Sequence, residues 1–418
     1  MPTETVETLV IGGGQAGLAM SHRLTQRGLP HLVLERGRIA ERWLSERWDG
    51  LRFQFPNWSV RLPDFPFANA DPDGFATSQQ ILDFITAYAD FIAPPIRCGI
   101  EVTRLARSED ASGFVAQTPS GVIAAHNVVV ATGPYQRPLV PRLFDGNAGL
   151  FQVHASRYGN PGQLPPGAVL VIGAGASGAQ IAEELHRAGR KVFLSVGRHN
   201  RLPRRYRGRD LFWWLAEMRI DQTPVEQRGP RRLLPVISGA HGGRTVDFRR
   251  FAAEGIVLLG RVTSAGADIV DIAPDLAESL ANGDLGYATF LDTVDAYARQ
   301  HALDCPDDPD ARMRWPDPPD VVDPPGRLDL RAEGIHSVIW ATGYGVDFGW
   351  IDIPVVARGE PVHVRGVTGV PGLYFLGLQW LSKMSSSFLS GVGDDAARLA
   401  DHIAARGRRP SAKKTPVM

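Results

Sequence analysis

A strand that runs directly into a glycine-rich turn occurs twice in this chain, each time with the glycine spacing GxGxxG. The glycines of the two turns are Gly12, Gly14 and Gly17, and Gly173, Gly175 and Gly178. Each turn opens a segment of helical composition, at residues 18–27 and 179–188, and a second apolar strand follows, at residues 31–34 and 191–196. Such a repeat fixes the architecture before other features are considered. The sequence therefore predicts two βαβ units that bind dinucleotides.

The first turn has the full context of a dinucleotide site. Its first glycine permits the tight turn, its second lets the backbone approach a pyrophosphate, and its third lets helix and strand pack closely. Glu35 ends the second strand, where a carboxylate accepts hydrogen bonds from an adenosine ribose. This favours an unphosphorylated ribose, as in FAD or NAD, over a purely structural turn.

The second turn has no acidic residue at the matching place. The strand at residues 192–196 runs instead into Arg198, and five more arginines lie between residues 201 and 209. A guanidinium binds a 2′-phosphate through a charge-assisted fork, whereas a carboxylate would repel it. Arg198 therefore predicts NADPH as the second nucleotide. The alternative for the run is a solvated loop or a patch that docks the other domain, and this alternative is favoured for the distal arginines.

An Ala-Thr-Gly sequence at the end of a buried strand closes each unit. The two copies are Ala131, Thr132 and Gly133, and Ala341, Thr342 and Gly343. We therefore predict an α/β fold of the glutathione-reductase type with two Rossmann-like dinucleotide-binding domains. Residues 1–150 and 335–418 would form the FAD-binding domain, and residues 151–334 an NADPH-binding domain inserted in it.

Other segments give local expectations. Apolar residues at helical spacing predict a helix at residues 79–92, residues 97–106 read as a strand, and a further helix is expected at residues 394–405. Prolines and aspartates crowd residues 305–326, which favours an ordered excursion or a linker there.

Composition excludes several classes of protein. The chain has 45 Lys and Arg against 45 Asp and Glu, so no overall field attracts nucleic acid or an anionic membrane. No apolar stretch approaches the ~18 residues that a membrane helix needs. Its two cysteines, Cys98 and Cys305, form neither a CxxC pair nor a zinc-ligand cluster. We therefore expect a reducing cytoplasm, no metal site and no CxxC disulfide reductase.

Several segments beyond the paired turns resemble the class B flavin-dependent monooxygenases, which include flavin-containing monooxygenases, YUCCA-type plant enzymes and a related bacterial group of flavoproteins. These segments are Trp43 and residues 51–57, 62–67, 341–344, 372–377 and 388–396. The resemblance spans nearly the whole chain. It implies an oxidoreductase that uses FAD, NADPH and O₂ and inserts one oxygen atom into a small organic substrate through a flavin C4a-(hydro)peroxide.

The predicted cofactor contacts combine the motifs with this resemblance. They are Gly12, Gly14, Gln15, Ala16, Gly17, Glu35, Arg36, Trp43, Val102, Ala131, Thr132, Gly133, Gly173, Gly175, Ala176, Ser177, Gly178, Arg198, Ala341, Thr342, Gly343 and Gly391. The positive N-terminal end of the last helix, which follows Gly391, is expected to stabilise charge on the flavin.

Two positions depart from the family pattern while keeping a hydrogen-bond donor. A gapless match puts Gln54 where flavin-containing monooxygenases carry an asparagine, and Asn57 where relatives often carry a lysine. A carboxamide can donate to an oxygen species beside the flavin. We therefore predict Gln54 and Asn57 as the catalytic residues. The alternative is that each only satisfies backbone groups in a proline-rich loop.

The family fingerprint between the two nucleotide sites is also altered. Its histidine is expected four residues after Gly146, but His154 follows eight residues later, while Tyr158 keeps the histidine-to-aromatic spacing. His154 either couples domain rotation to catalysis, as the resemblance implies, or is an ordinary linker histidine. The Trp ending typical of Baeyer-Villiger enzymes is absent, which makes lactone-forming chemistry less favoured.

Other functions remain open from the sequence alone. A flavoprotein NADPH oxidase or reductase, passing electrons to O₂ or a carrier, would need the same two nucleotide sites, and so would a non-catalytic nucleotide sensor. The sequence does not identify the substrate, and it allows a monomer or a homodimer.

Overall fold

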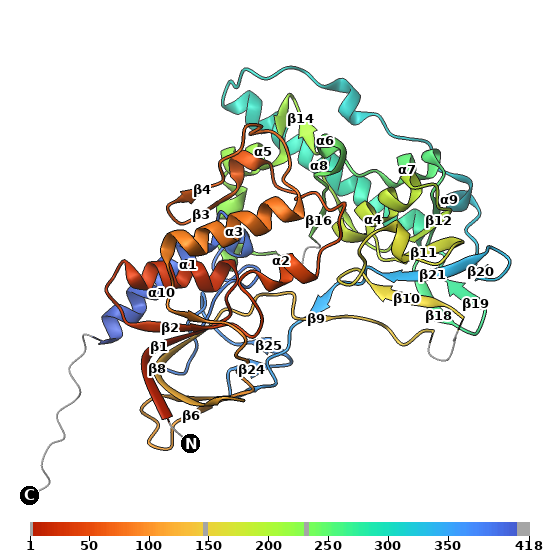
Figure 1. The fold of residues 1–418 in the computed structure, drawn as a ribbon. Helices are drawn as coiled ribbons and strands as arrows, with labels where there is room; N and C mark the ends of the chain where they lie inside the picture. The colour runs from red at the N-terminus through yellow and green to blue at the C-terminus, as the bar shows by residue number, and fades with distance from the viewer. Residues whose placement is uncertain (1–2, 145–148, 230–233, 408–418) are drawn as a thin grey trace, which may run out of the picture.

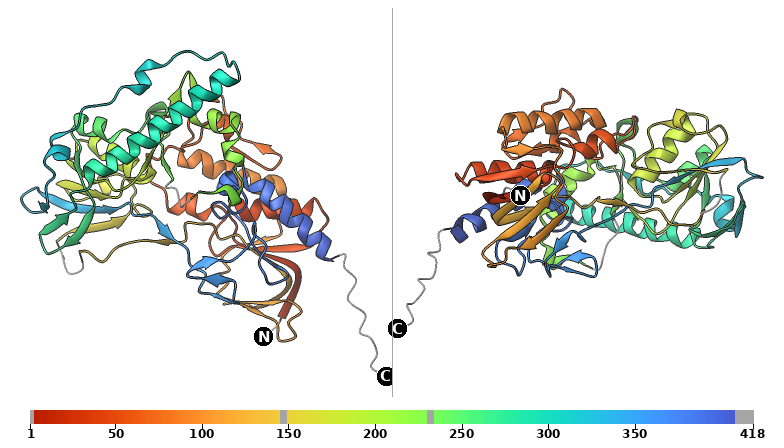
Figure 2. Two further views of the ribbon diagram at one scale, coloured as in Figure 1. Left: turned by 180° about the vertical axis from the view of Figure 1, so that it is seen from behind. Right: turned by 60° about the horizontal axis from the view of Figure 1, so that its bottom comes forward.

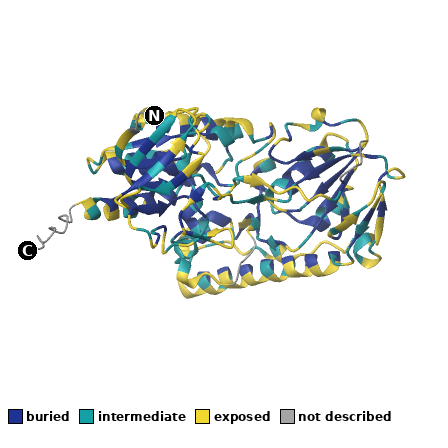
Figure 3. Cartoon of the chain, turned by 90° about the horizontal axis from the view of Figure 1, so that it is seen from below, coloured by how far each residue is buried: buried dark blue, intermediate teal, exposed yellow. Residues whose placement is uncertain are grey.

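The structure is a computed structural model that describes residues 3–144, 149–229 and 234–407. One α/β body is built around the first glycine turn and another around the second, and extended segments pass between them (Figures 1 and 2). Buried residues concentrate along the strands of both bodies (Figure 3).

Strands from the N-terminal and C-terminal parts of the chain form the sheet of the first body. Its order is β23-β6-β7-β8-β1-β2-β5, and β26 also pairs with β8. The strands are β1 (Thr3–Ile11), β2 (His31–Leu34), β5 (Ile96–Arg97), β6 (Arg104–Arg107), β7 (Phe114–Thr118), β8 (Gly121–Val130), β23 (Ile351–Asp352) and β26 (Leu373–Phe375). β1 runs parallel to β2 and β8, and β26 runs parallel to β8. The chain therefore leaves this sheet after β8 and returns to it at β23.

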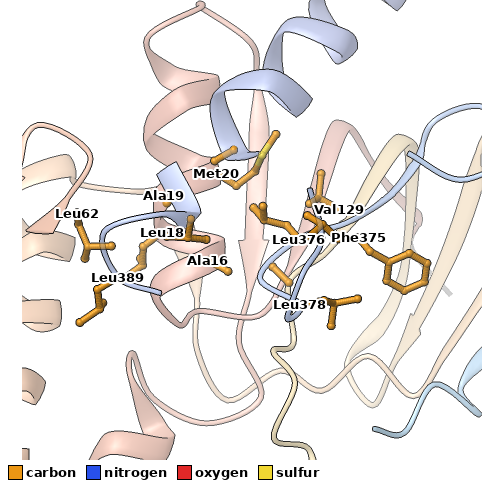
Figure 4. Close-up of a cluster of buried hydrophobic side chains, with 14 of the residues drawn as sticks. Ala16, Leu18, Ala19, Met20, Leu62, Val129, Phe375, Leu376, Leu378 and Leu389 are labelled. Carbon is orange, nitrogen blue, oxygen red and sulfur yellow. The ribbon is translucent and has the colours of Figure 1, made fainter. Parts of the chain in front are cut away.

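Helices from both ends of the chain cover the first sheet. They are α1 (Gln15–Thr25), α2 (Glu41–Ser45), α3 (Ser78–Ile92) and α10 (Val392–Gly407). α1 packs against α10 (Figure 1). Figure 4 shows Leu18 and Met20 of α1 with Val129 of β8 and Leu376, which follows β26, in this buried cluster. The C-terminal segment is thus part of the core that supports the first turn.

The second body has a parallel sheet in the order β10-β21-β11-β12-β17. Its strands are β10 (Phe151–His154), β11 (Ala168–Ile172), β12 (Val192–Ser195), β17 (Val257–Leu259) and β21 (Ile335–Trp340). An antiparallel sheet joins β18 (Val262–Ala265), β19 (Ile269–Ile272) and β20 (Arg327–Asp329). The helices are α4 (Ala176–Arg187), α6 (Ala240–Gly243), α7 (Phe248–Glu254), α8 (Leu276–Gln300) and α9 (Pro319–Val322).

Part of the inserted chain packs into the first body. α5 (Leu211–Glu217) contributes Phe212 and Trp214 to the core that contains β1 and α1. The long helix α8 contacts both cores, with Leu276 and Leu280 in the second and Phe290 and Val294 in the first. One face of this helix is buried along its length (Figure 3). The inserted segment, through α5 and α8, therefore joins the two bodies at a second place besides the extended connections.

The connections between the bodies pair with each other. β9 (Arg137–Pro138) lies on the outward connection and pairs antiparallel with β22 (Tyr344–Gly345) on the return connection. Leu139 N–H donates to the Gly343 carbonyl at 3.0 Å, and Thr342 Oγ1 donates to the Leu139 carbonyl. The ends of the two Ala-Thr-Gly strands are thereby tied to one short ribbon.

His154 joins the same junction from the end of β10. Ser156 N–H donates to His154 Nδ1 at 3.1 Å, so the neutral ring carries its proton on Nε2, 3.1 Å from the Gly343 carbonyl. Burial lowers the pKa of His154, and the hydrogen bond to Gly343 opposes this shift. Tyr158 is buried nearby in sequence and donates to Glu184 of α4 at 2.9 Å.

The predicted α/β fold, with one Rossmann-like unit inserted in another, is confirmed. The expected strand at residues 97–106 is wrong. β5 ends at Arg97 and β6 begins at Arg104, because Gly99 and Ile100 donate their N–H groups to the carbonyls of Gly37 and Glu35 instead of to a strand. The predicted boundary at residue 335 also needs correction. β21 pairs with β10 and β11, so the chain returns to the first body only after Trp340.

We expect the titration of His154 to reduce folding stability below about pH 6.5, because the unfolded chain binds a proton that the buried ring resists. The loss ends at the lowered pKa of the folded state and is at most about 1.4 kcal/mol per pH unit. His154→Gln keeps a donor for Gly343 but does not titrate. Urea unfolding at about pH 7.5 and about pH 5.5 should therefore show a smaller difference in this variant, and an equal difference would contradict the assignment.

Candidate cofactor and active site

The first glycine turn is packed so closely that two of its glycines cannot carry a side chain. Gly12 has φ +117°, and a Cβ there would lie 2.6 Å from the Ala131 carbonyl oxygen. A Cβ at Gly17 would lie 1.8 Å from the Gly12 carbonyl oxygen. A Cβ at Gly14 would have no neighbour within 4 Å. The turn is therefore tight against β8 but open at Gly14, where the family would place a pyrophosphate.

Glu35 is fixed beside this turn by backbone donors. Its carboxylate accepts from Gly13 N–H at 2.6 Å and from Gly37 N–H at 2.8 Å. A carboxylate has roughly four acceptor positions, so it retains capacity for two ribose hydroxyls. The Glu35 carbonyl accepts from Ile100 N–H at 2.9 Å, which brings the segment leading to buried Val102 to the same place. Arg36 is exposed next to it.

The C-terminal loop closes the first site from the other side. Gln15 donates through Nε2 to the Ser387 carbonyl at 2.8 Å, and a Cβ at Gly377 would lie 2.6 Å from the Cβ of Ala16. Gly391 lies close to Ser385, since a Cβ added at Gly391 would be 2.1 Å from the Ser385 carbonyl oxygen. Ser385 is buried, and its hydroxyl has no partner within the described residues. α1 also begins without a side-chain cap.

These features fit FAD. The open Gly14, the uncapped start of α1 and the unpaired Ser385 hydroxyl offer an anion site and a free polar group in one region. The sequence prediction did not include Ser385, Ser387 or Gly377. The only available signal was the family-like stretch at residues 372–377 and the serines before the last helix.

The second turn repeats the geometry of the first. A Cβ at Gly173, where φ is +106°, would lie 2.5 Å from the Ala341 carbonyl oxygen, and one at Gly178 would lie 1.9 Å from the Gly173 carbonyl oxygen. A Cβ at Gly175 would have no neighbour within 4 Å. α4 then begins at Ala176, followed by Ser177, with no side-chain cap and no acidic residue in its first turn. This region fits the pyrophosphate of a second nucleotide.

The arginines after β12 differ sharply in their surroundings. Arg198 is exposed, and no residue in the described ranges forms a polar contact with its side chain. Arg201 is buried between Asp247 and Asp284, while Arg207 pairs with Asp295. Arg204 is also buried and contacts the first body. Arg205 donates to the Gly242 and Gly243 carbonyls, and exposed Arg209 rests on the ring of Trp213. Arg198 is thus the exposed arginine directly after β12 whose side chain makes no polar contact among the described residues.

The two Ala-Thr-Gly strand ends lie where both nucleotide turns meet the connections. Gln136 donates to Thr132 Oγ1 at 2.9 Å and to the Gly133 carbonyl at 2.8 Å. The Gly343 carbonyl accepts from Leu139 N–H and His154. These predicted contact residues therefore shape the floor of each turn and also tie the turns to the paired connections.

The segment with the predicted catalytic residues reaches the first site through aromatic contacts. The rings of Phe55 and Phe388 are 4.8 Å apart, and Phe388 follows the Ser387 carbonyl that accepts from Gln15. Phe53 also contacts Trp43 at 5.4 Å between ring centroids. This segment thus lies beside the loop that closes the first turn.

The two predicted catalytic residues differ in their contacts. Gln54 is half-buried, and its backbone carbonyl accepts from Arg204 at 2.6 Å. Asn57 is buried and donates through Nδ2 to the Asp71 carbonyl at 2.8 Å, which is the backbone-satisfying alternative stated above. Its Oδ1 has no partner within the described residues.

The chain is similar in sequence to several known oxidoreductases. The family profile of the pyridine nucleotide-disulphide oxidoreductases matches residues 9–209. An uncharacterized CzcO-like oxidoreductase of Geobacillus kaustophilus is 32% identical over 403 residues, covering 95% of this chain and 98% of the relative. The chain belongs to the CzcO-like oxidoreductases. Rice indole-3-pyruvate monooxygenase YUCCA1 is 31% identical over 195 residues, covering 45% of this chain and 47% of that one.

Solved structures share the fold over nearly the whole chain. A mutant flavin monooxygenase from Stenotrophomonas maltophilia has a TM-score of 0.64 at 18% identity, covering 97% of this chain and 99% of that one. The bacillithiol disulfide reductase of Staphylococcus aureus has a TM-score of 0.62 at 15% identity, covering 97% and 100%. Together with the sequence relatives, these findings confirm the resemblance to the class B flavin-dependent monooxygenases. This CzcO-like oxidoreductase family member thus shares its fold with flavin monooxygenases and a disulfide reductase.

Two glycine substitutions should separate folding from cofactor binding. Gly17→Ala drives a methyl group into the Gly12 carbonyl and should cost about 3 kcal/mol of folding stability. Gly14→Ala fills open space at a φ of −86° and should cost about 1 kcal/mol or less, yet weaken FAD binding by about tenfold or more. Urea unfolding of the cofactor-free protein and FAD titration measure the two effects. Normal FAD affinity in a folded Gly14→Ala variant would place the pyrophosphate elsewhere.

Proposed function

We propose that this CzcO-like protein is an NADPH-dependent FAD monooxygenase that inserts one oxygen atom of O₂ into a small organic substrate. The observation that carries the proposal is the contrast between the two turns. Both are open at their second glycine, but one has a fixed carboxylate, Glu35, and the other an exposed guanidinium, Arg198, with no polar partner among the described residues. A protein that holds an unphosphorylated and a phosphorylated dinucleotide side by side is built for hydride transfer between them.

In this proposal each body contributes a distinct task. The described residues before β9 and after β22 would form the FAD domain, and the described residues from β10 to β21 would form the NADPH domain. Glu35 would accept the ribose hydroxyls of FAD, Gly14 and Gly175 would admit the two pyrophosphates, and Arg198 would bind the 2′-phosphate. When bound, FAD would take a hydride from NADPH and then activate O₂.

The chain's own residues would keep water from the reacting atoms. Phe55 contacts Phe53, Phe212 and Phe388, with ring centroids 5.0, 4.3 and 4.8 Å apart. Such an aromatic wall lowers the local dielectric and strengthens a well-placed donor. Gln54, on the same segment, would donate its amide N–H to the oxygen species, and Asn57 would act beside it.

Other features of the proposal concern location and partners. Cys98 and Cys305 are both free thiols, which supports a reducing cytoplasm. No helix within the described residues is long and apolar enough to cross a membrane. The proposed partners are a small organic molecule and O₂, with the protein acting as a monomer or homodimer.

An NADPH oxidase or reductase is the second candidate, because the same fold occurs in a disulfide reductase. Steady-state NADPH consumption with a panel of amines, thioethers, 2-oxo acids and heteroaromatics separates the two. The proposal expects oxygenated product from at least one class of substrate. Formation of one H₂O₂ from O₂ for each NADPH oxidised, or transfer of all the electrons of NADPH to a carrier, would favour the second candidate.

Loss of the Arg198 guanidinium should act on NADPH alone. We expect Arg198→Ala to raise the KM for NADPH roughly thirtyfold, about 2 kcal/mol of charge-assisted hydrogen bonding, and to leave the KM for NADH unchanged. Arg209→Ala is the matched control, because Arg209 is an exposed member of the run that rests on the ring of Trp213. Equal use of both nucleotides by the unmutated protein would refute the assignment.

Loss of the Gln54 carboxamide should divert oxygen to H₂O₂. We expect Gln54→Leu to leave flavin reduction by NADPH intact while costing about 1 to 3 kcal/mol of stabilisation in the oxygen-transfer step, since a buried partner is left unpaired. The ratio of H₂O₂ to product measures this cost. Asn57→Leu is expected to raise the same ratio and also to loosen the loop at Asp71. A Gln54→Leu variant with unchanged coupling would remove Gln54 from the mechanism.

A further inference from the structure

We propose that Arg204 is a positioning residue that holds the Gln54 segment in place from the inserted part of the chain. Its guanidinium is 1% exposed and donates through Nη1 to the Gln54 carbonyl at 2.6 Å. The two residues are 150 positions apart in the sequence. The inference rests on the proposed role of Gln54, although the contact itself does not.

The guanidinium is held in one orientation by its other contacts. Nε donates to Asp210 Oδ2 at 2.9 Å, and the guanidinium carbon lies 4.2 Å from the ring centroid of Phe75. The Arg204 backbone N–H donates to Thr245 Oγ1 at 2.9 Å. A planar guanidinium that is bound by Asp210 at its edge and packed on Phe75 at its face holds Nη1 in a set direction, which suits it to fix a carbonyl.

Asp210 links this arginine to the aromatic wall. It caps α5, because its side chain accepts from Phe212 N–H at 2.9 Å while it also binds Arg204. α5 then presents Phe212 to Phe55, with ring centroids 4.3 Å apart. Asp210 therefore links two residues that contact consecutive positions of one segment. Arg204 contacts the carbonyl of Gln54, and Phe212 contacts the ring of Phe55.

The residue before Gln54 is constrained as well. Phe53 N–H donates to the Ala76 carbonyl at 2.7 Å. The Phe53 carbonyl oxygen lies against Gly239, where an added Cβ would be 2.0 Å away. The backbone is thus fixed at both polar groups of Phe53, and Arg204 supplies a charged contact at the next carbonyl. A carboxamide on this backbone can hold a productive direction only while the backbone stays in place.

A buried ion pair that serves only stability is the alternative, and Arg201 provides the matched control. Arg201 is also buried, pairs with Asp247 and Asp284, and lies 4.2 Å from the ring centroid of Tyr287. All of these partners lie in the inserted segment. Arg201→Met should therefore cost folding stability as Arg204→Met does, without acting on Gln54.

The first measurement is amide hydrogen exchange in the full chain, which needs no substrate. In Arg204→Met we expect amides at residues 52–57 to exchange about tenfold or more faster than in Arg201→Met, after normalisation to the amides of β11. A double variant, Arg204→Met with Asp210→Asn, is the substitute if Arg204→Met alone does not fold. The asparagine still caps α5, and no carboxylate is left without its arginine. Arg204→Lys should give an intermediate rate.

The second measurement is the H₂O₂-to-product ratio of the FAD-loaded protein with NADPH. We expect it to rise about tenfold in Arg204→Met and the double variant, to be unchanged in Arg201→Met, and to be partly restored in Arg204→Lys. Unchanged exchange at residues 52–57, or faster exchange with an unchanged ratio, would overturn the proposal. Faster local exchange in a protein that oxygenates no substrate would support the hold on Gln54 and refute the proposed function instead.

Discussion

The close approach of a glycine turn to a neighbouring strand end is the constraint on which both bodies depend. Gly12 and Gly173 each lie against the carbonyl of an Ala-Thr-Gly alanine, at Ala131 and Ala341, with no space for a side chain. This contact fixes where the first strand ends, where the helix begins and which strand lies beside them. It also explains why the same two motifs recur together, since neither turn can close without its strand end. The second glycine of each turn is left facing open space, which is what a phosphate requires.

The same strand ends join the two bodies mechanically. The chain leaves the first body after Ala131 and returns after Ala341, and these two connections pair as β9 and β22. The Gly343 carbonyl accepts from both Leu139 and His154, so it belongs to the second nucleotide turn, the outward connection and the end of β10 at once. A displacement of either turn would therefore also displace the ribbon that β9 and β22 form between the bodies. α8 adds a separate tie, because its two halves pack into different cores.

Local sequence predicted the parts of this protein that depend on local geometry. The GxGxxG turns, the strand at residues 31–34 and the carboxylate at Glu35 follow from spacing and turn chemistry, and the structure has them as expected. The strand expected at residues 97–106 failed because its middle pairs with the turn after Glu35, a tertiary contact that β propensity does not encode. Ser385 was missed for a similar reason. Nothing in a run of serines shows which hydroxyl is buried without a partner.

The burial and contacts of the arginines after β12 could not be predicted from the sequence. Among six arginines that look alike in the sequence, Arg198 is exposed without a polar partner in the described residues, Arg201 is bound by carboxylates, and Arg204 is buried and contacts the first body. Burying a guanidinium costs several kcal/mol, and an apolar side chain of similar volume would pack there at less cost. An arginine at this position is therefore explained by the directional bonds it makes, to Asp210 and to the Gln54 carbonyl. Arg198 and Arg204 lie on one short stretch of chain after β12. The group proposed to meet the nucleotide phosphate and the group proposed to hold Gln54 therefore come from the same short stretch of chain.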